Sequence, residues 1–412
     1  MATPEGKVGA SAPAVSGSAW AVLRERPFRA LWLADFINNL GFFAQAVGAG
    51  WLMTSLTSDA HVIALVQTAT SLPLFVLAIP AGILADLVDR RRLIRDANIL
   101  LTLVAAALAA LTFAGHASVF ALLAFTFVLG AIDALQEPAW GALIPEVVSA
   151  RALPSAIALN GIGFNLTRVL GPPIAGFLVA VTGPAAAFAI NAASFVPTIA
   201  VMRPRAGWRW PTRTAFADGF AKTWSVARTS VGVRRVLARN AAFSTCSSVL
   251  FALMPLLVRE HFHGSAVQLG VLLGALGAGS VTIAQFFGEV RTRLGIEGAV
   301  FIGTVTLGAC VIVAGCTPWF PLAVVALFVA GFGWLTVLST LNTSIQFAVD
   351  PQHRAAGFAL YLVTSQGINA VGAALWGIVA SAGGVGTAFV AAGALFIILG
   401  AATRRIPLPW SQ

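Results

Sequence analysis

Long apolar runs, separated by short stretches that contain charge, glycine or proline, dominate the pattern of this chain. The runs are continuously apolar and longer than ten residues, so they lack the alternation that a membrane-spanning β-strand requires. A helix needs about 20 apolar residues to cross a bilayer. The pattern therefore predicts twelve spanning helices. Their expected ranges are 28–54, 62–85, 93–114, 118–142, 154–180, 184–202, 237–258, 266–288, 298–316, 320–346, 355–381 and 386–403.

The composition agrees with lipid as the solvent of these helices. Of 412 residues, 58% are hydrophobic and only 10% are charged, with a mean hydropathy of +0.89. About a quarter of the residues of an ordinary soluble protein are charged, so this chain lacks the polar surface that would dissolve it. Its 28 Phe and 11 Trp exclude a disordered chain in water. An all-α polytopic membrane protein is therefore predicted.

The net charge of +10 would suggest nucleic-acid binding in a soluble chain, so the positions of the basic residues decide between two interpretations. Among the 25 Lys and Arg, only Arg259 falls in an outer connection and only Arg168 lies deep within a span. The others lie on the side of the two termini, as the positive-inside rule requires of the cytoplasmic side. We expect cytoplasmic termini, a multi-pass location in the inner (cytoplasmic) membrane, contact with anionic lipids and no nucleic-acid partner.

The chain divides into two halves of six spans, because its one long polar connection falls near its midpoint. The predicted organisation is a first six-helix bundle at 20–202, a cytoplasmic linker at 203–235 and a second bundle at 236–412. In each half the fourth span is followed by a short charged turn, which ends at Arg151 or at Arg354. A repeat of half the chain length is typical of secondary transporters, whose solute site lies between two pseudo-symmetric halves.

Two segments outside the bundles have patterns of their own. Residues 1–19 are rich in Ala, Ser, Gly and Pro and lack an apolar core, which predicts a disordered cytoplasmic tail rather than a signal peptide. In the linker, Phe216, Phe220 and Trp224 recur every four residues. This spacing predicts an amphipathic helix that lies on the inner leaflet.

The sharpest motif lies between the second and third spans. It reads Gly82-Ile-Leu-Ala-Asp86-Leu-Val-Asp89-Arg90-Arg91-Arg92. This run resembles the cytoplasmic loop signature of the major facilitator superfamily, with mild departures at Leu87 and Asp89. The resemblance implies that the motif takes part in gating.

Each residue of this motif has a physical role that fits gating. Gly82 permits the close approach of another helix, and Asp86 can sit at the positive N-terminus of a neighbouring helix. Arg90 and Arg91 can clamp a carboxylate across the seam between the halves, and Glu146, at the inner end of span four, is the candidate partner.

A second motif lies in span five. Gly163 is followed eight residues later by Gly171-Pro172, a spacing that resembles the fifth-span signature of the superfamily's antiporters. Glycine and proline bend a helix and let it pack closely against a partner. In the resembled family this bend keeps one side of the cavity sealed, which implies gating roles for Gly163, Gly171 and Pro172.

Two further stretches, Gln136-Glu137-Pro138-Ala-Trp140 and Phe164-Asn165-Leu-Thr-Arg168, are similar to one branch of the superfamily. That branch contains the bacterial enterobactin exporter. The resemblance implies the major facilitator fold of two six-helix bundles and an efflux function. The arginine that proton-coupled drug exporters carry in span four is absent here.

Ionisable side chains inside a span are costly, so they are candidates for function by default. Asp133 and Glu137 are spaced i,i+4 and share one face of span four. With Asp35 of span one they are the proton-coupling candidates, because neighbouring carboxylates in an apolar medium are suited to loading and releasing a proton. The alternative for Glu137 is a place at headgroup level, paired with a loop arginine. Arg168 needs a carboxylate or an anionic ligand, so we expect it to bind an anionic or catecholate-like substrate group or to exchange partners with the acidic side chains.

Polar and aromatic residues of spans one, four, five, ten and eleven are the substrate-binding candidates, since these spans line the cavity in the resembled fold. Besides Arg168, they are Asn38, Asn39, Phe42, Gln45, Gln136, Trp140, Asn160, Asn165, Trp334, Asn342, Gln346, Tyr361, Gln366 and Asn369. For a single aromatic residue, packing against lipid is the alternative. The amides are the better candidates, because lipid would leave their hydrogen bonds unmade.

Together these features predict a secondary active transporter, not an enzyme, that exports a small hydrophobic or amphipathic compound, drug-like or siderophore-like, by proton antiport and alternating access. The sequence contains neither a Walker motif nor a set of metal ligands, so we expect no cofactor and no metal, and energy must come from an ion gradient. A monomer is expected. Two alternatives stand beside this prediction: a lysophospholipid flippase of the same fold, and a polytopic membrane enzyme or sensor.

Overall fold

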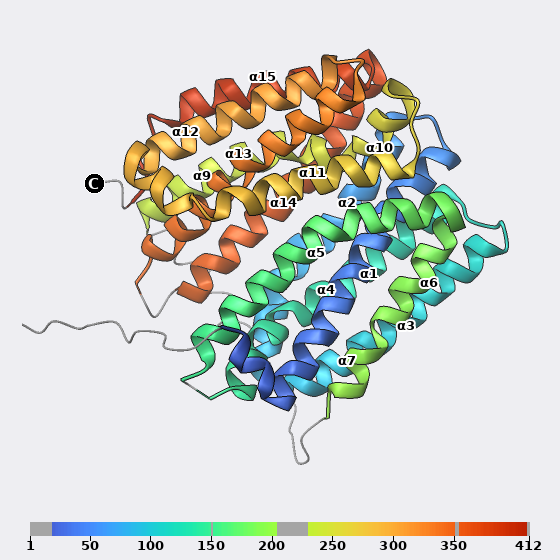
Figure 1. Cartoon of the computed structure of the whole chain (residues 1–412), viewed down its shortest axis with the longest axis vertical. Helices are drawn as coiled ribbons and strands as arrows, with labels where there is room; N and C mark the ends of the chain where they lie inside the picture. The colour runs from blue at the N-terminus through green and yellow to red at the C-terminus, as the bar shows by residue number, and fades with distance from the viewer. Residues whose placement is uncertain (1–18, 150, 204–229, 351–353, 410–412) are drawn as a thin grey trace, which may run out of the picture.

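The structure, a computed structural model, describes residues 19–149, 151–203, 230–350 and 354–409. These residues fold into helices joined by short turns (Figure 1). In chain order they are η1 (Ala19–Arg24), α1 (Arg26–Leu56), α2 (Ala60–Leu87), α3 (Arg90–Phe113), α4 (Val119–Val147), α5 (Leu153–Thr182), α6 (Pro184–Ser194), α7 (Val196–Val201), α9 (Val231–Ala252), α10 (Met254–Leu256), the π-helical turn η2 (Leu257–His261), α11 (Ala266–Ala284), α12 (Phe287–Cys316), α13 (Phe320–Phe347), α14 (Arg354–Gly383) and α15 (Val385–Thr403).

Each of the twelve predicted spans is helical, which confirms the predicted class of fold. Span six is divided between α6 and α7 next to Pro197, and span seven between α9, α10 and η2 next to Pro255, because proline removes a helical hydrogen bond. In the described chain, eleven helical segments are long and apolar enough to cross a membrane. The remaining span, α1, is 31 residues long but contains the polar residues Asp35, Asn38 and Asn39.

Several helices extend beyond the apolar run that predicts them. Helix α9 begins at Val231 rather than at 237, and α12 begins at Phe287 rather than at 298. The added turns contain arginine and glutamate, which are good helix formers, so the helix continues after the hydrophobic run has ended. Gly295, at φ 66°, interrupts the helical backbone within α12. The predicted tail, except its last residue, and residues 204–229 of the linker with its amphipathic helix lie outside the described residues; the domain bounds stay predictions.

The helices gather in two groups, which we call the first group (α1–α7) and the second group (α9–α15) (Figure 1). Within the first group α1 packs against α5 and α6; within the second, α12 packs against α13 and α15. The groups meet along two helix pairs, α2 with α14 and α5 with α11. These pairs are spans two and eleven, and spans five and eight. A shift of six spans exchanges the pairs, as expected for two pseudo-symmetric halves.

The seam between α5 and α11 is a contact between backbones. A Cβ atom on Gly176 would lie against the carbonyl oxygen of Ala266 and 2.9 Å from the Cα of Gly270. A Cβ atom on Gly270 would lie 2.5 Å from the carbonyl oxygen of Pro172. Both separations are shorter than a real side chain tolerates, so this approach requires glycine on both helices.

The second group contains an ion pair whose arginine is buried and whose glutamate is partly exposed. The Arg239 side chain is only 3% exposed, and its Nη2 lies 2.6 Å from Oε2 of Glu297. The same guanidinium donates to the carbonyl oxygen of Thr403 at 2.6 Å, and Oε1 of Glu297 accepts the backbone N–H of Leu408 at 2.8 Å. The pair thus joins α9, α12 and the segment that follows α15.

We expect Glu297→Ala to lower the free energy of unfolding by about 3–5 kcal/mol, because it leaves the Arg239 cation buried without its counter-ion. The matched control is Glu289→Ala on the same helix, whose pair with Arg293 is exposed on both sides and is expected to contribute about 0.3–0.5 kcal/mol. Denaturant unfolding of the detergent-purified proteins measures both. Equal losses in the two variants would contradict the structural importance of the buried pair.

Candidate substrate and proton site

Three acidic side chains come together in the first group. Asp35 lies on α1, Asp133 and Glu137 lie on α4, and the three charges act on one another. Asp35 and Asp133 are partly buried, whereas Glu137 is exposed. Within the described part of the chain Glu137 forms no ion pair with a loop arginine, the partner that its alternative interpretation requires. The three carboxyl groups thus form one cluster, and their role in proton coupling remains a prediction.

Hydrogen bonds connect one of these carboxylates to α3. Oδ1 of Asp133 accepts from Nε2 of Gln136 at 2.9 Å, and Oε1 of Gln136 accepts from Nδ2 of Asn98 at 2.6 Å. Gln136 and Asn98 are 4% and 0% exposed. Gln136, a predicted substrate ligand, is therefore engaged by protein groups. Sequence analysis missed Asn98, although an amide inside a span is a signal that could have found it.

Arg168 lies at the seam between the groups. Its guanidinium carbon is 5.6 Å from the centre of the Trp334 ring on α13, a cation–π contact. Two rings of α9, those of Phe243 and Phe251, pack against Trp334 with centroids 5.3 Å away. Of the described residues, no acidic side chain pairs with Arg168. The expected exchange of partners with the acidic cluster is not seen in this conformation.

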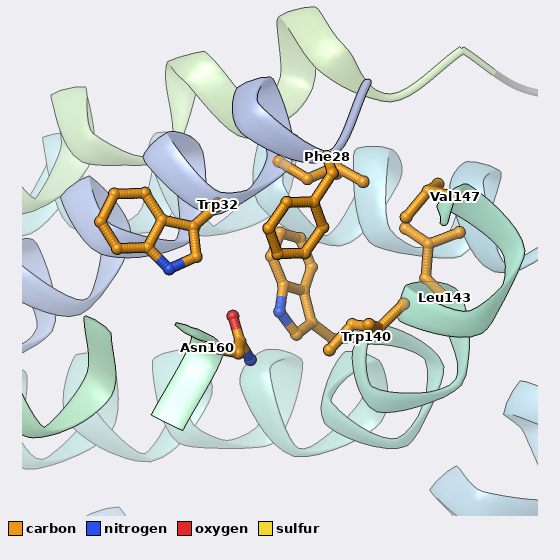
Figure 2. Close-up of a pocket in the computed structure, with 8 residues that line it drawn as sticks. Phe28, Trp32, Trp140, Leu143, Val147 and Asn160 are labelled. Carbon is orange, nitrogen blue, oxygen red and sulfur yellow. The ribbon is translucent and has the colours of Figure 1, made fainter. Parts of the chain in front are cut away.

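A small pocket opens between α1, α4 and α5 (Figure 2). Figure 2 shows the indole rings of Trp32 and Trp140 with the Asn160 side chain directed toward them. Nε1 of Trp32 donates to the carbonyl oxygen of Leu159 at 3.1 Å. Trp140 and Asn160 are predicted substrate ligands that the structure does bring together. Phe28 and Trp32, which complete the aromatic lining, were not singled out by sequence analysis.

Most other predicted substrate ligands are engaged locally. Gln45 and Tyr361 are 9% and 2% exposed, so both are part of the helix packing. Four amides form hydrogen bonds along their own helices. Asn39 donates to the Asp35 carbonyl oxygen and Asn165 to the Gly161 carbonyl oxygen, each at 2.8 Å. Gln346 donates to the side-chain oxygen of Asn342, the fourth amide, at 3.1 Å. Phe42 is 47% exposed, and Asn38 and Gln366 are partly buried. These residues do not form one cluster with the pocket of Figure 2.

Polar contacts close the seam between α2 and α14 at one end of the molecule. Nε2 of Gln67 donates to Oδ1 of Asn369 at 3.1 Å, and the Ser71 hydroxyl donates to the same oxygen at 3.3 Å. Thr68 donates to the carbonyl oxygen of Ala370 at 2.9 Å. Asn369, a predicted substrate ligand, thus joins the two groups. Gln67 is its unpredicted partner.

Two further contacts join the groups at the same end, which we call the closed end (residues 51–71, 259 and 369–381). Nη1 of Arg259 donates to the hydroxyl oxygens of Thr54 and Ser55 at 3.0 and 2.9 Å. The Ser381 hydroxyl donates to Oδ1 of Asp59 at 2.9 Å. This bond, with the backbone N–H of His61, holds the pKa of the exposed Asp59 below its usual value.

The motif before α3 lies at the opposite end of the helices. Nη1 of Arg90 is 2.8 Å from Oε1 of Glu146, so the predicted partner is confirmed. The pair joins α3 to α4 within the first group, however, and does not cross the seam as expected. Among the described residues, no atom lies within 4 Å of a Cβ placed on Gly82, so the expected close helix approach is not seen there. The side chain of Asp86 is outside the described part, and Arg91 donates its backbone N–H to Asp89 at 3.0 Å.

The glycines of the span-five motif face α1. A Cβ on Gly163 would lie 3.0 Å from Nε1 of Trp32, and one on Gly171 would lie 2.5 Å from Cδ2 of Phe43. Helix α5 continues as one element through Pro172. The predicted close packing at Gly163 and Gly171 is confirmed, while their part in gating remains a prediction.

The helix arrangement is that of solved transporters. It matches a bacterial homolog of the human lysosomal transporter Spinster, in an inward-facing and occupied conformation, with a TM-score of 0.71 at 17% identity over 94% of this chain and 98% of that chain. It matches the human organic anion transporter MFSD10 with a TM-score of 0.62 at 18% identity over 92% and 99% of the two chains. The protein is thus a polytopic membrane protein with the major facilitator fold.

The family model described as transmembrane secretion effector matches residues 17–412, and the chain belongs to this family of major facilitator transporters. Its curated relatives include the enterobactin exporter EntS of Citrobacter koseri, 26% identical over 94% of this chain and 95% of that protein. The multidrug efflux pump Tap of Mycolicibacterium fortuitum is 27% identical over 89% and 94%. The staphyloferrin A transporter of Staphylococcus aureus is 20% identical over 67% and 70%. The predicted family resemblance is confirmed.

We expect Gly176→Val to prevent closure of the seam between α5 and α11, because the new side chain would meet the backbone of α11. Spin labels at His116 and Trp319, both exposed near the closed end, should then lie farther apart than in the unsubstituted protein. Exposed Cys316 is replaced first in all samples. The control is Gly161→Val on the same helix, where an added Cβ meets nothing within 4 Å. The interpretation fails if both variants keep the original distance.

Proposed function

We propose that the protein is a proton-coupled exporter of a small amphipathic compound that works by alternating access, and that it is not an enzyme. The contacts between the groups at the closed end support a conformation that is open at the opposite end. The basic residues gather at that open end, so the positive-inside rule assigns it to the cytoplasm, together with both termini. The bacterial origin of the exporter relatives supports the inner membrane as location. We propose a monomer in contact with anionic lipids.

The observation that carries the proposal is the separation of intramembrane charges into an acidic cluster and a cation that pairs with no acidic side chain of the described residues. Asp35, Asp133 and Glu137 lie together in the first group, whereas Arg168 faces Trp334 of the second group. Charged groups inside a membrane are costly, so those that a protein retains there usually serve its function. The acidic cluster can carry protons while Arg168 binds a substrate, so proton binding and substrate binding use different residues of the same protein.

Arg168 favours a substrate that carries an acidic group. A guanidinium without a counter-ion recognises carboxylates and phenolates through several N–H donors, and the neighbouring aromatic rings suit an apolar or aromatic body. The names of the relatives give enterobactin, staphyloferrin A and several drugs as their substrates. We propose a siderophore-like or drug-like anion as the exported compound, with Trp140, Asn160 and the pocket of Figure 2 as further contacts.

Asp133→Asn is expected to abolish proton coupling, because an amide cannot release a proton. The protein is reconstituted in vesicles with an imposed pH gradient, and transport of enterobactin, ethidium and a lysophospholipid is measured with proton movement. The unsubstituted protein should transport at least one compound with counter-movement of protons; Asp133→Asn should lose the dependence on the gradient. An unchanged dependence would exclude Asp133 as a coupling residue. Transport of the lysophospholipid alone would favour the flippase.

Arg168→Gln is expected to raise the KM for an anionic siderophore by about 10- to 100-fold, the loss expected for hydrogen bonds to a charged group. Transport of the cationic dye ethidium should change much less. The control is Arg293→Gln, which removes an exposed arginine of α12, a helix that forms neither seam. This variant should leave both KM values unchanged. Equal effects of Arg168→Gln on the anion and the cation would contradict charge recognition by this residue.

A further inference from the structure

The backbone of α3 determines the direction of the hydrogen bonds between α3 and α4. Nδ2 of Asn98 donates to the backbone carbonyl oxygen of Ile94 at 2.8 Å, and a carbonyl can only accept. The same nitrogen donates to Oε1 of Gln136 at 2.6 Å. The amide of Gln136 must therefore place its nitrogen on the other side, where Nε2 donates to Oδ1 of Asp133 at 2.9 Å. The backbone of α3 thus determines which atom of Gln136 faces the carboxylate.

The burial of both amides separates them from substrate. Asn98 is 0% exposed and Gln136 is 4% exposed, while Asp133, which accepts the last hydrogen bond, is only partly buried. Both N–H donors of Asn98 are used, by Ile94 and by Gln136. A rotated Gln136 would bring two oxygens together, its own and that of Asp133, inside an apolar surrounding where that arrangement is costly. The native orientation is therefore the only one that fits an ionised Asp133.

The charges around Asp133 are few. On its own helix Glu137 is one turn away, and from α1 Asp35 interacts with the pair. On α3 the charged residues nearest to Asn98 in sequence, Arg95 and Asp96, pair with each other at 2.8 Å. Residues 62–85 of α2 contain no ionisable side chain, and α5 contributes only Arg168, which faces Trp334. Among the described residues, Gln136 is thus the one hydrogen-bond donor to Asp133.

We propose that Gln136 is a positioning residue for proton exchange at Asp133, and that Asn98 acts through it by fixing the orientation of its amide. The inference rests on the proposed function, because it concerns the same carboxylate. The Gln136 N–H group stabilises the ionised carboxylate more than the protonated carboxyl group, whose remaining acceptor oxygen forms a weaker, neutral hydrogen bond. Each proton that Asp133 takes up therefore weakens this hydrogen bond, and each release strengthens it.

Infrared titration of the purified protein tests this without any substrate. The band of protonated Asp133 is identified as the one that Asp133→Asn removes. We expect Gln136→Met, which keeps the size of the side chain, to move the midpoint of this band to higher pH by about one unit, a tenfold change in proton affinity. Asn98→Leu should move it in the same direction by a smaller amount. Since Asn98 acts through Gln136, the double variant should titrate like Gln136→Met alone.

Asn191→Leu is the matched control. Asn191 is a 2% exposed amide of the first group that donates to Gln45 and does not contact Asp133, so its removal should leave the midpoint unchanged. If Asn98→Leu does not purify folded, Gln136→Met alone must produce the shift. An unchanged midpoint in Gln136→Met overturns the inference. The inference also fails if Asn98→Leu shifts the midpoint equally in the unsubstituted protein and in Gln136→Met. Loss of coupling in Asp133→Asn together with unchanged midpoints would retain the proposed function and reject only the role of Gln136.

Discussion

The absence of water inside a bilayer determines most of this structure. Hydrocarbon offers no hydrogen bonds, so each backbone polar group must be satisfied within the protein, and helices do this locally. The same requirement explains the hydroxyl groups along α13, where Thr340 and Ser344 donate to carbonyl oxygens one turn earlier in their own helix. In such surroundings a charged side chain without an ion-pair partner is informative. Arg168 is such a group, and the function that we propose depends on it.

The two seams between the groups satisfy this constraint in different ways. The seam between α5 and α11 is formed by glycine and proline backbone and requires few polar side chains. The seam between α2 and α14 is polar, and Gln67, Ser71 and Asn369 satisfy one another across it. Glycine also serves there, because a Cβ on Gly377 would lie 2.8 Å from the Cα of His61. Both seams close at the same end although their chemistry differs.

Hydropathy was sufficient to predict the twelve spans, because length and apolarity decide whether a helix crosses a bilayer. The pair of Arg90 and Glu146 was predictable from a local signature and from the end of the membrane at which both residues lie. The buried pair of Arg239 and Glu297 was not, because such pairing depends on how α9 and α12 are rotated about their axes. Spacing along one chain does not determine that rotation.

In the candidate site too, positions along one helix were predictable and contacts between helices were not. The i,i+4 spacing was sufficient to place Asp133 and Glu137 on one face of α4, since both lie on one helix. It did not reveal the bond between Gln136 and Asn98, which joins two helices, nor the contact between Arg168 and Trp334, which joins two groups. The expectation for Gly82 depended on the conformation of the transporter. Sequence does not specify which conformation a structure captures.

The glycine seam has a consequence for the number of states that the closed end can adopt. Its attraction is dispersion between backbones, and a gap of about 0.5–1 Å already removes a quarter to a half of such an interaction. Partial opening would therefore lose much of the contact energy while the space remains too narrow for water. The seam is stable when fully closed or fully hydrated, and intermediate separations are disfavoured. For the alternating access that we propose, such a contact favours two discrete populations, and moving the protein from 1:99 to 99:1 takes about 5.5 kcal/mol of differential binding.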